Sequence, residues 1–256
     1  MINEAPVYTL KDISLTFGVR PLFTSVSLNI CRGDKICLVG RNGSGKSTLL
    51  KIISGVMEPD GGEVFVQPGL KIAYMEQAAD FSKYETLQDV ILSGLDAETK
   101  ESQAYRADIL AGQLDIKREI SPKTASGGEL KKAALARALI GEPDILLLDE
   151  PTNYLDEEHI AWLKRYLLDY ENAFILISHD IPFLNEVVNI IYHMENQELN
   201  RYVGDYDHFQ EVYAVKKAQL EAAYRRQQQE ISELKDFVAR NKARVSTRNM
   251  AMSRQK

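Results

Sequence analysis

The strongest fold signal in this chain of 256 residues is Gly40-Arg-Asn-Gly-Ser-Gly-Lys46-Ser47. It fits the phosphate-loop pattern GxxxxGK[ST], between a short apolar run, Lys35–Val39, and a helix-favouring segment, Thr48–Ile53. Glycines let successive backbone N–H groups face one anion, and the following helix adds its positive end. Lys46 would reach the β- and γ-phosphates, and the Ser47 hydroxyl would bind Mg²⁺. A chance glycine-rich turn is the alternative, but the flanking segments favour a nucleotide site.

Strand-like and helix-like segments alternate on both sides of this loop. Tyr8–Leu15 and Val26–Ile30 alternate apolar and polar residues with a period of two, and a turn is expected near Arg20-Pro21. Residues 85–120 carry apolar side chains at helical spacing. Further strands are expected at Glu63–Val66, Lys71–Tyr74, Ile145–Leu148 and Phe174–Ile177. The alternation predicts an α/β fold with a largely parallel sheet.

Composition restricts the class of protein. The chain is 45% hydrophobic and 27% charged, which is enough apolar content for one large domain and excludes disorder as the main state. Its two cysteines, Cys31 and Cys37, exclude a disulfide scaffold and are predicted to be reduced thiols. No apolar run approaches membrane-spanning length, and no signal-peptide pattern is visible. We therefore expect a soluble, cytoplasmic protein without membrane insertion.

Charge is divided unevenly along the chain. Residues 1–210 carry 20 basic and 32 acidic side chains, whereas residues 211–256 carry 11 basic and 5 acidic ones. Residues 211–245 lack glycine and proline and show an imperfect heptad pattern, with seam residues Tyr213, Leu220, Tyr224, Ile231, Leu234, Val238 and Val245. This pattern predicts a long amphipathic helix that needs a partner. Its basic end indicates contact with a polyanion, and a solvated helix surface is the alternative.

Two acids follow the apolar run Ile145–Leu148. Asp149 suits a direct or water-mediated contact with Mg²⁺, and Glu150 suits a general base that activates water. An apolar strand ending in Asp is weak evidence alone, but it is strong beside the phosphate loop. His179, at the end of the next predicted strand, is a candidate for contact with the γ-phosphate and the water. A purely structural histidine is the alternative.

A second glycine pair precedes a helix-favouring segment, Leu130–Ile140. Ser126-Gly-Gly-Glu129 places two glycines at the start of this helix, where backbone N–H groups can bind an anion. The loop at residues 40–47 already accounts for one triphosphate. The second site therefore indicates the γ-phosphate of another protomer, and a simple helix cap by Ser126 is the alternative.

These motifs together resemble the ATP-binding cassette (ABC) family, in the family's order and over about residues 7–208. The resemblance implies a P-loop NTPase of the α/β class, with an N-terminal antiparallel β subdomain and a small helical subdomain at about 78–140. A basic linker, the first limb of a helical hairpin, would occupy residues 209–256. ATP hydrolysis is the implied reaction, with ATP and Mg²⁺ as the implied cofactors.

The resemblance also assigns site residues. Glu150, His179 and Gln77 would be catalytic, while Ser47, Gln77 and Asp149 would bind Mg²⁺. Phe17 stands where an aromatic ring stacks on adenine, with a core phenylalanine as the alternative, and Asn153–Asp156 matches the family's dimer-contact loop. The residues expected to bind nucleotide are Phe17, Gly40, Arg41, Asn42, Gly43, Ser44, Gly45, Lys46, Ser47, Thr48, Ser126, Gly127, Gly128 and Glu129. Each ATP in the family lies between one protomer's residues 40–47 and the other's 126–129.

Several details resemble the ABC-F branch, whose soluble twin-cassette members act on ribosomes. Glu129 replaces the glutamine usual in transporters, and Glu150-Pro-Thr-Asn-Tyr-Leu-Asp156 is close to the branch's Glu-Pro-Thr-Asn-His-Leu-Asp. The branch's linker approaches the P-site tRNA, which implies rRNA and P-site tRNA as partners of residues 209–256. The segment between Gln77 and Ser126 holds a small helical subdomain without a long inserted arm, which favours a Uup-like member.

The chain departs from the branch at two points. Ala125 replaces the usual leucine, which would loosen the packing of the helix that follows. Neither a second cassette nor a returning linker helix is present, so the chain resembles the N-terminal half of a twin protein and is expected to need a second cassette or a homodimer partner. Two alternatives stay open: an ATPase subunit of a membrane transporter, which leaves residues 211–256 unexplained, and an ATP-dependent DNA-binding protein.

Overall fold

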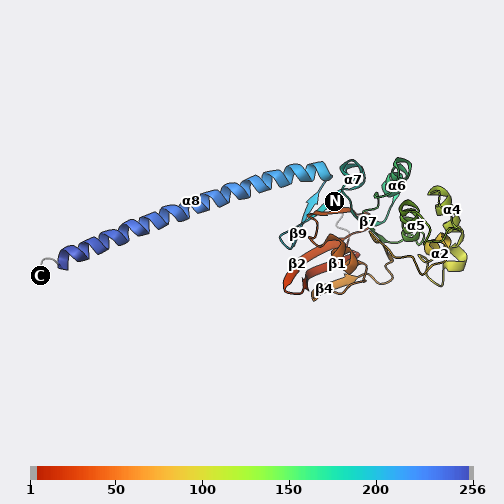
Figure 1. Ribbon diagram of the computed structural model, residues 1–256, viewed down its shortest axis with the longest axis horizontal. Coiled ribbons are helices and arrows are strands. Elements are labelled where there is room, and N and C mark those ends of the chain that lie inside the picture. Colours follow the sequence, from red (N-terminus) through yellow and green to blue (C-terminus); the bar gives the residue numbers. More distant parts are fainter. Residues whose placement is uncertain (1–4, 254–256) are drawn as a thin grey trace. The chain divides into compact units, whose positions relative to one another are not determined.

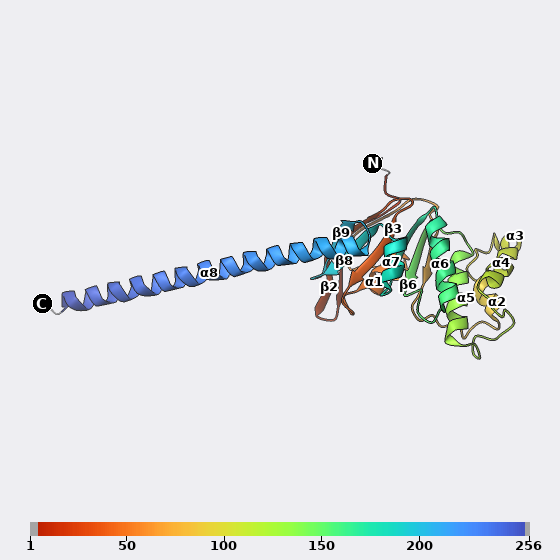
Figure 2. The same cartoon turned by 90° about the horizontal axis from the view of Figure 1, so that it is seen from above.

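The computed structural model describes the backbone of residues 5–253 and the side chains of residues 5–236. The chain divides into two units, Met1–Tyr206 and Asp207–Lys256. We call the first the cassette unit and the second the linker unit, and each is described by itself. Figures 1 and 2 show the elements of both units in two perpendicular views.

A three-stranded antiparallel sheet begins the cassette unit. Its strand order is β2-β1-β4, from β1 (Tyr8–Phe17), β2 (Arg20–Ile30) and β4 (Gly61–Val66). The register pairs Phe17 with Arg20 and Thr16 with Pro21, so the turn lies at residues 18–19. The predicted turn near Arg20-Pro21 is therefore present, immediately before Arg20. Gly18 adopts a φ of 63° there, and its left-handed backbone, rather than the proline, reverses the chain.

The main sheet has six strands in the order β5-β6-β7-β3-β8-β9. These are β3 (Lys35–Gly40), β5 (Ile72–Met75), β6 (Ile145–Asp149), β7 (Ala173–Ile177), β8 (Ile190–Glu195) and β9 (Glu198–Val203). All neighbours pair in parallel except β8 and β9, which confirms a largely parallel sheet. β8 was not predicted from the sequence, because His193 and Glu195 interrupt the apolar run that marks the other buried strands.

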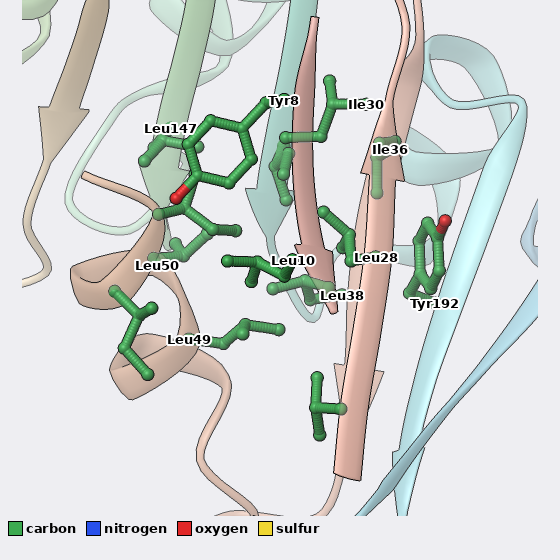
Figure 3. Close-up of a cluster of buried hydrophobic side chains, with 14 of the residues drawn as sticks. Tyr8, Leu10, Leu28, Ile30, Ile36, Leu38, Leu49, Leu50, Leu147 and Tyr192 are labelled. Carbon is green, nitrogen blue, oxygen red and sulfur yellow. The ribbon is translucent and has the colours of Figure 1, made fainter. Parts of the chain in front are cut away.

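A hydrophobic core cluster packs against both elements that flank the phosphate loop, β3 and α1 (Lys46–Ile53). Figure 3 shows Leu10 and Leu28 of the antiparallel sheet close to Leu38 of β3 and to Leu49 of α1. These side chains are almost completely buried. The cluster joins the small sheet, α1 and one face of the main sheet, while α6 (Glu157–Asp169) and α7 (Ile181–Val187) lie on the other side (Figure 1). Packing from two sheets therefore holds both ends of the loop between β3 and α1.

The region predicted as helical at 85–120 forms three short helices. They are α2 (Leu87–Leu92), α3 (Lys100–Gln103) and α4 (Tyr105–Gln113), and a longer helix, α5 (Gly127–Leu139), follows. Gly94 ends the first of them against α5. A Cβ atom at Gly94 would lie 2.0 Å from the carbonyl oxygen of Arg137, so only glycine allows the two backbones to approach this closely.

The linker unit is almost entirely one helix, α8 (Tyr206–Ser253), which begins at the last residue of the cassette unit. The heptad seam predicted a helix that needs a partner, and its members Leu220, Tyr224 and Leu234 are exposed. Val238, Val245 and the basic side chains beyond them lie outside the described side chains. Within the part of the chain that the structure describes, no helix is both long and apolar enough to cross a membrane.

Candidate nucleotide-binding site

A cleft of about 590 Å³ lies at the carboxyl-terminal edge of the main sheet. Parallel strands deliver their final residues to the same edge, so segments far apart in the sequence meet there. The lining residues are Phe17, Leu22, Asn42, Gly43, Gly45, Lys46, Ser47, Thr48, Gln77, Asp149, Glu150, Asn153, Ile177 and His179. Most of the residues predicted to hold ATP and Mg²⁺ therefore share one cleft, although Gly40, Arg41 and Ser44 do not line it.

The phosphate loop leads directly into helix α1. Gly45 precedes the helix with a φ of 103°, and a Cβ atom there would lie 2.6 Å from the ring of Phe23. Lys46 is only 8% exposed, and its Nζ donates hydrogen bonds to the carbonyl oxygens of Gly40 (2.9 Å) and Arg41 (3.2 Å). The ammonium group thus lies across the loop, where it can neutralise a phosphate bound by the backbone N–H groups.

Asp149 and Glu150 occupy the end of β6 beside the loop. Asp149 is buried, and Glu150 is 6% exposed. Glu150 adopts a φ of 50°, a left-handed backbone that is strained for a residue with a side chain. Burial raises the pKa of the Glu150 carboxyl group, and the nearby His179 acts in the opposite direction. A carboxylate with a raised pKa is a stronger proton acceptor, as a general base requires.

His179 and Phe17 both lie at the surface of the cleft. The His179 side chain is 69% exposed, and its Nε2 lies 3.3 Å from Oε1 of Glu150. This position differs from that of a buried structural histidine. Phe17 is 55% exposed at the end of β1, so it is not a core residue. Both positions favour the functional interpretation over the structural one.

The candidate Mg²⁺ ligands also meet in this cleft. Ser47, Gln77 and Asp149 bring a hydroxyl, an amide and a carboxylate, all with the oxygen donors that Mg²⁺ prefers. Among the described residues, no group of three His, Cys, Asp or Glu side chains could hold a metal ion. The arrangement fits an ion held by a few protein oxygens together with the phosphates of a nucleotide.

The second glycine pair does not line this cleft. Ser126 and Glu129 form a reciprocal capping box at the start of α5, in which Oε2 of Glu129 accepts from the Ser126 N–H at 2.8 Å. The helix cap by Ser126, the alternative to an anion site, is therefore present. Gly128 lies close to the loop 153–156, because a Cβ atom on it would be 3.1 Å from the carbonyl oxygen of Tyr154. The predicted anion site at Ser126–Glu129 is therefore separate from the cleft that the phosphate loop lines.

Sequence reasoning missed three residues of this region. Leu22 and Ile177 form apolar walls of the cleft. Lys131 is 6% exposed, and its Nζ donates a 3.2 Å hydrogen bond to the carbonyl oxygen of Asp149. A signal for Lys131 was present, because it lies three and four positions before Ala134 and Leu135, on the buried face of α5. A lysine on an apolar helical stripe is uncommon unless its charge has a use.

The fold and the cleft together define a nucleotide-binding cassette. The sequence profile described as ABC transporter matches residues 23–153, and a second profile with the same description matches residues 192–256. The chain belongs to the ATP-binding cassette family, whose members hydrolyse ATP.

Curated relatives are consistent with the ABC-F branch. The chain is 48% identical to an uncharacterized ABC transporter ATP-binding protein, YfmM of Bacillus subtilis, over 98% of this chain and 56% of that protein. It is 43% identical to the ATP-binding protein Uup of Caulobacter vibrioides, over 81% of this chain and 33% of that protein. The chain therefore spans about half, or less, of the length of these relatives.

Solved structures match the cassette fold. An ATP-binding subunit of an ABC transporter has a TM-score of 0.70 and 23% identity, covering 85% of this chain and 98% of that one. A dimeric ATP-binding cassette in a post-hydrolysis state, bound to ADP and Pi, has a TM-score of 0.66 and 24% identity, covering 77% and 98%. These matches establish a P-loop NTPase of the ABC type, and the second comes from a dimer.

Proposed function

We propose that this chain is an ABC-F ATPase cassette that hydrolyses ATP at a site completed by a second cassette. The observation that carries the proposal is the convergence of Lys46, Glu150 and His179 in one cleft. Phe17 at the surface of the same cleft supplies a ring for stacking on adenine. In this proposal the full activity requires a second cassette together with this chain.

Each polar group of the cleft has a separate task in this proposal. Lys46 and the loop N–H groups bind the β- and γ-phosphates. Ser47, Gln77 and Asp149 would hold Mg²⁺, which would supply positive charge against the charge that develops on the phosphates. Glu150 accepts a proton from water as the water oxygen bonds to the γ-phosphorus. The bond from that phosphorus to the bridging oxygen breaks and leaves ADP. His179, within 3.3 Å of Glu150, orients the water and the γ-phosphate.

Turnover per protein is expected to rise with protein concentration. The two halves of the proposed composite site, residues 40–47 and 126–129, do not meet in one cleft of this chain. ATP should therefore bind to a single copy but turn over slowly until two copies associate. Steady-state hydrolysis measured over a hundredfold range of concentration checks this. A constant rate per protein would contradict the composite site.

We further propose that the ATP-bound assembly docks on the ribosome and modulates translation. Glu129 and the segment Glu150–Asp156 support this proposal through their likeness to ABC-F sequences. The basic residues 239–256 supply charge for rRNA or P-site tRNA. The alternatives are a transporter subunit and a DNA-binding protein. The name of one relative, an ABC transporter ATP-binding protein, supports the transporter alternative.

Co-sedimentation with ribosomes tests the docking proposal. A Glu150→Gln variant, which should retain ATP, is expected to pellet with ribosomes at physiological salt only when ATP is present. A second chain with Arg240, Lys242, Arg244 and Arg248 all changed to Ala should pellet less and keep its ATP affinity. Pelleting without regard to ATP, or no pelleting of Glu150→Gln, would contradict docking by this half. ATP-dependent retention on duplex DNA instead would favour the DNA-binding alternative.

A further inference from the structure

A buried amino group links the helix after the glycine pair to the two acids of the cleft. Lys131 lies in the first turn and a half of α5, two residues after Glu129. Its side chain is almost completely buried, and its Nζ donates to the carbonyl oxygen of Asp149 at 3.2 Å. No ion pair to Lys131 is found among the described side chains. Burial of an ammonium group costs stability, and the charges of Asp149 and Glu150 offset part of that cost, so Lys131 is tied to these two acids rather than to apolar packing.

The hydrogen bond from Lys131 is made to the peptide group that joins Asp149 to Glu150. The Asp149 carbonyl and the Glu150 N–H belong to the same peptide unit. That N–H donates to the carbonyl oxygen of Ile177 at 2.9 Å, so the peptide plane is held at both ends. Glu150 immediately after it has the strained φ of 50°. A strained conformation persists only where its surroundings hold it in place.

We propose that Lys131 is a positioning residue, which holds the Asp149–Glu150 peptide so that the Glu150 carboxylate faces the attacking water. The inference rests on the proposed role of Glu150 as the base. Ser126–Glu129 lies at the start of α5, and Lys131 lies further along the same helix. A phosphate bound at the start of α5 would therefore contact the helix whose Lys131 holds the peptide before Glu150. Lys131 thereby connects the two halves of the composite mechanism.

The charge of Lys131 also acts on Glu150. The charged groups that face this carboxyl are Asp149 of β6, His179 after β7, Lys46 of α1 and Lys131 of α5. Burial and the charge of Asp149 raise the pKa of this carboxyl group, and His179, Lys46 and Lys131 lower it. Lys131 therefore acts on the Asp149–Glu150 segment through its hydrogen bond as well as through its charge.

The matched pair Lys131→Met and Lys132→Met tests the proposal. Lys132 is the next residue of α5, and its Nζ donates to a different carbonyl oxygen, that of Asp115, at 2.9 Å. Both substitutions remove one charge and one hydrogen bond to a carbonyl group from the same helix. Only Lys131→Met is expected to lower kcat, by about 10- to 100-fold, with the KM for ATP within about twofold.

A third variant and a second readout separate positioning from folding. Lys131→Gln keeps a donor for the Asp149 carbonyl without the charge, so it should recover part of kcat. Amide hydrogen exchange at residues 149–152 should become faster in Lys131→Met and stay unchanged in Lys132→Met, whether or not the chain turns over ATP. Exchange that accelerates along α5 instead would show a packing role and overturn the proposal.

Failure of this inference differs from failure of the proposed function. If Glu150→Gln abolishes turnover while Lys131→Met matches Lys132→Met in both kcat and exchange, then Glu150 is the base and Lys131 does not position it. If Glu150→Gln hydrolyses ATP at the unsubstituted rate, the assignment of the base itself is wrong. In that case, faster exchange at residues 149–152 in Lys131→Met would still show that Lys131 holds the peptide.

Discussion

Glu150→Gln is expected to lower the rate of ATP hydrolysis by about 10²- to 10⁴-fold, the usual contribution of a general base. The amide that replaces the carboxylate has nearly the same shape but cannot accept the proton of the attacking water. ATP should still bind, because Lys46 and the loop N–H groups are unchanged. The variant should therefore accumulate with ATP bound, in the state where two cassettes are closed on the nucleotide. Single-turnover hydrolysis and equilibrium ATP binding measure the two effects separately.

Glu158→Gln provides the matched control for this experiment. Glu158 lies in the first turn of α6, is exposed and does not line the cleft. The same change of charge there should leave hydrolysis within about twofold of the unsubstituted chain, as surface substitutions usually do. Wild-type turnover by Glu150→Gln would remove Glu150 from the mechanism. Loss of ATP binding by that variant would show instead that the carboxylate shapes the site.

Lys46→Ala is expected to weaken ATP binding by about 30- to 3,000-fold, since truncating one partner of a buried charge pair costs about 2–5 kcal/mol. The ammonium group is held by the carbonyl oxygens of Gly40 and Arg41 and has almost no contact with solvent. Its removal leaves the phosphate charge to the backbone N–H groups alone. Titration with a fluorescent ATP analogue measures the loss of affinity.

Lys51→Ala is the control on the same helix. Lys51 lies in the last turn of α1 and does not line the cleft. Both variants remove one positive charge from α1, so a general electrostatic effect would weaken binding equally. Near-normal affinity of Lys51→Ala beside a large loss in Lys46→Ala would locate the effect at the phosphate loop. Equal affinities of the two variants would contradict the assigned role of Lys46.

Much of the fold could be predicted because its signals are local. Apolar runs in the sequence marked β3, β6 and β7. The loop after β3 was marked by its glycines, and Gly45 adopts a left-handed φ of 103° that favours glycine. β8 was not predicted, because His193 interrupts its apolar run and its parallel pairing with β3 joins segments that lie far apart in the sequence. The short helices at 87–113 depend on contacts such as that between Gly94 and α5, which no local pattern reveals.

Within the site, the sequence by itself determined which chemical groups are available and in what order. Two motifs of fixed spacing could be identified: residues 40–47, and the acid pair Asp149-Glu150. Each is a local feature, because the first is a single loop and the second is the end of a single strand. Only the tertiary structure decided which groups meet. It brought His179 to 3.3 Å from Glu150 and placed Phe17 at the cleft surface. It also left Ser126–Glu129 outside the cleft and directed Lys131 to the Asp149 carbonyl. These outcomes depend on how strands and helices pack, and packing joins residues whose separation in the sequence carries no information about their distance in space.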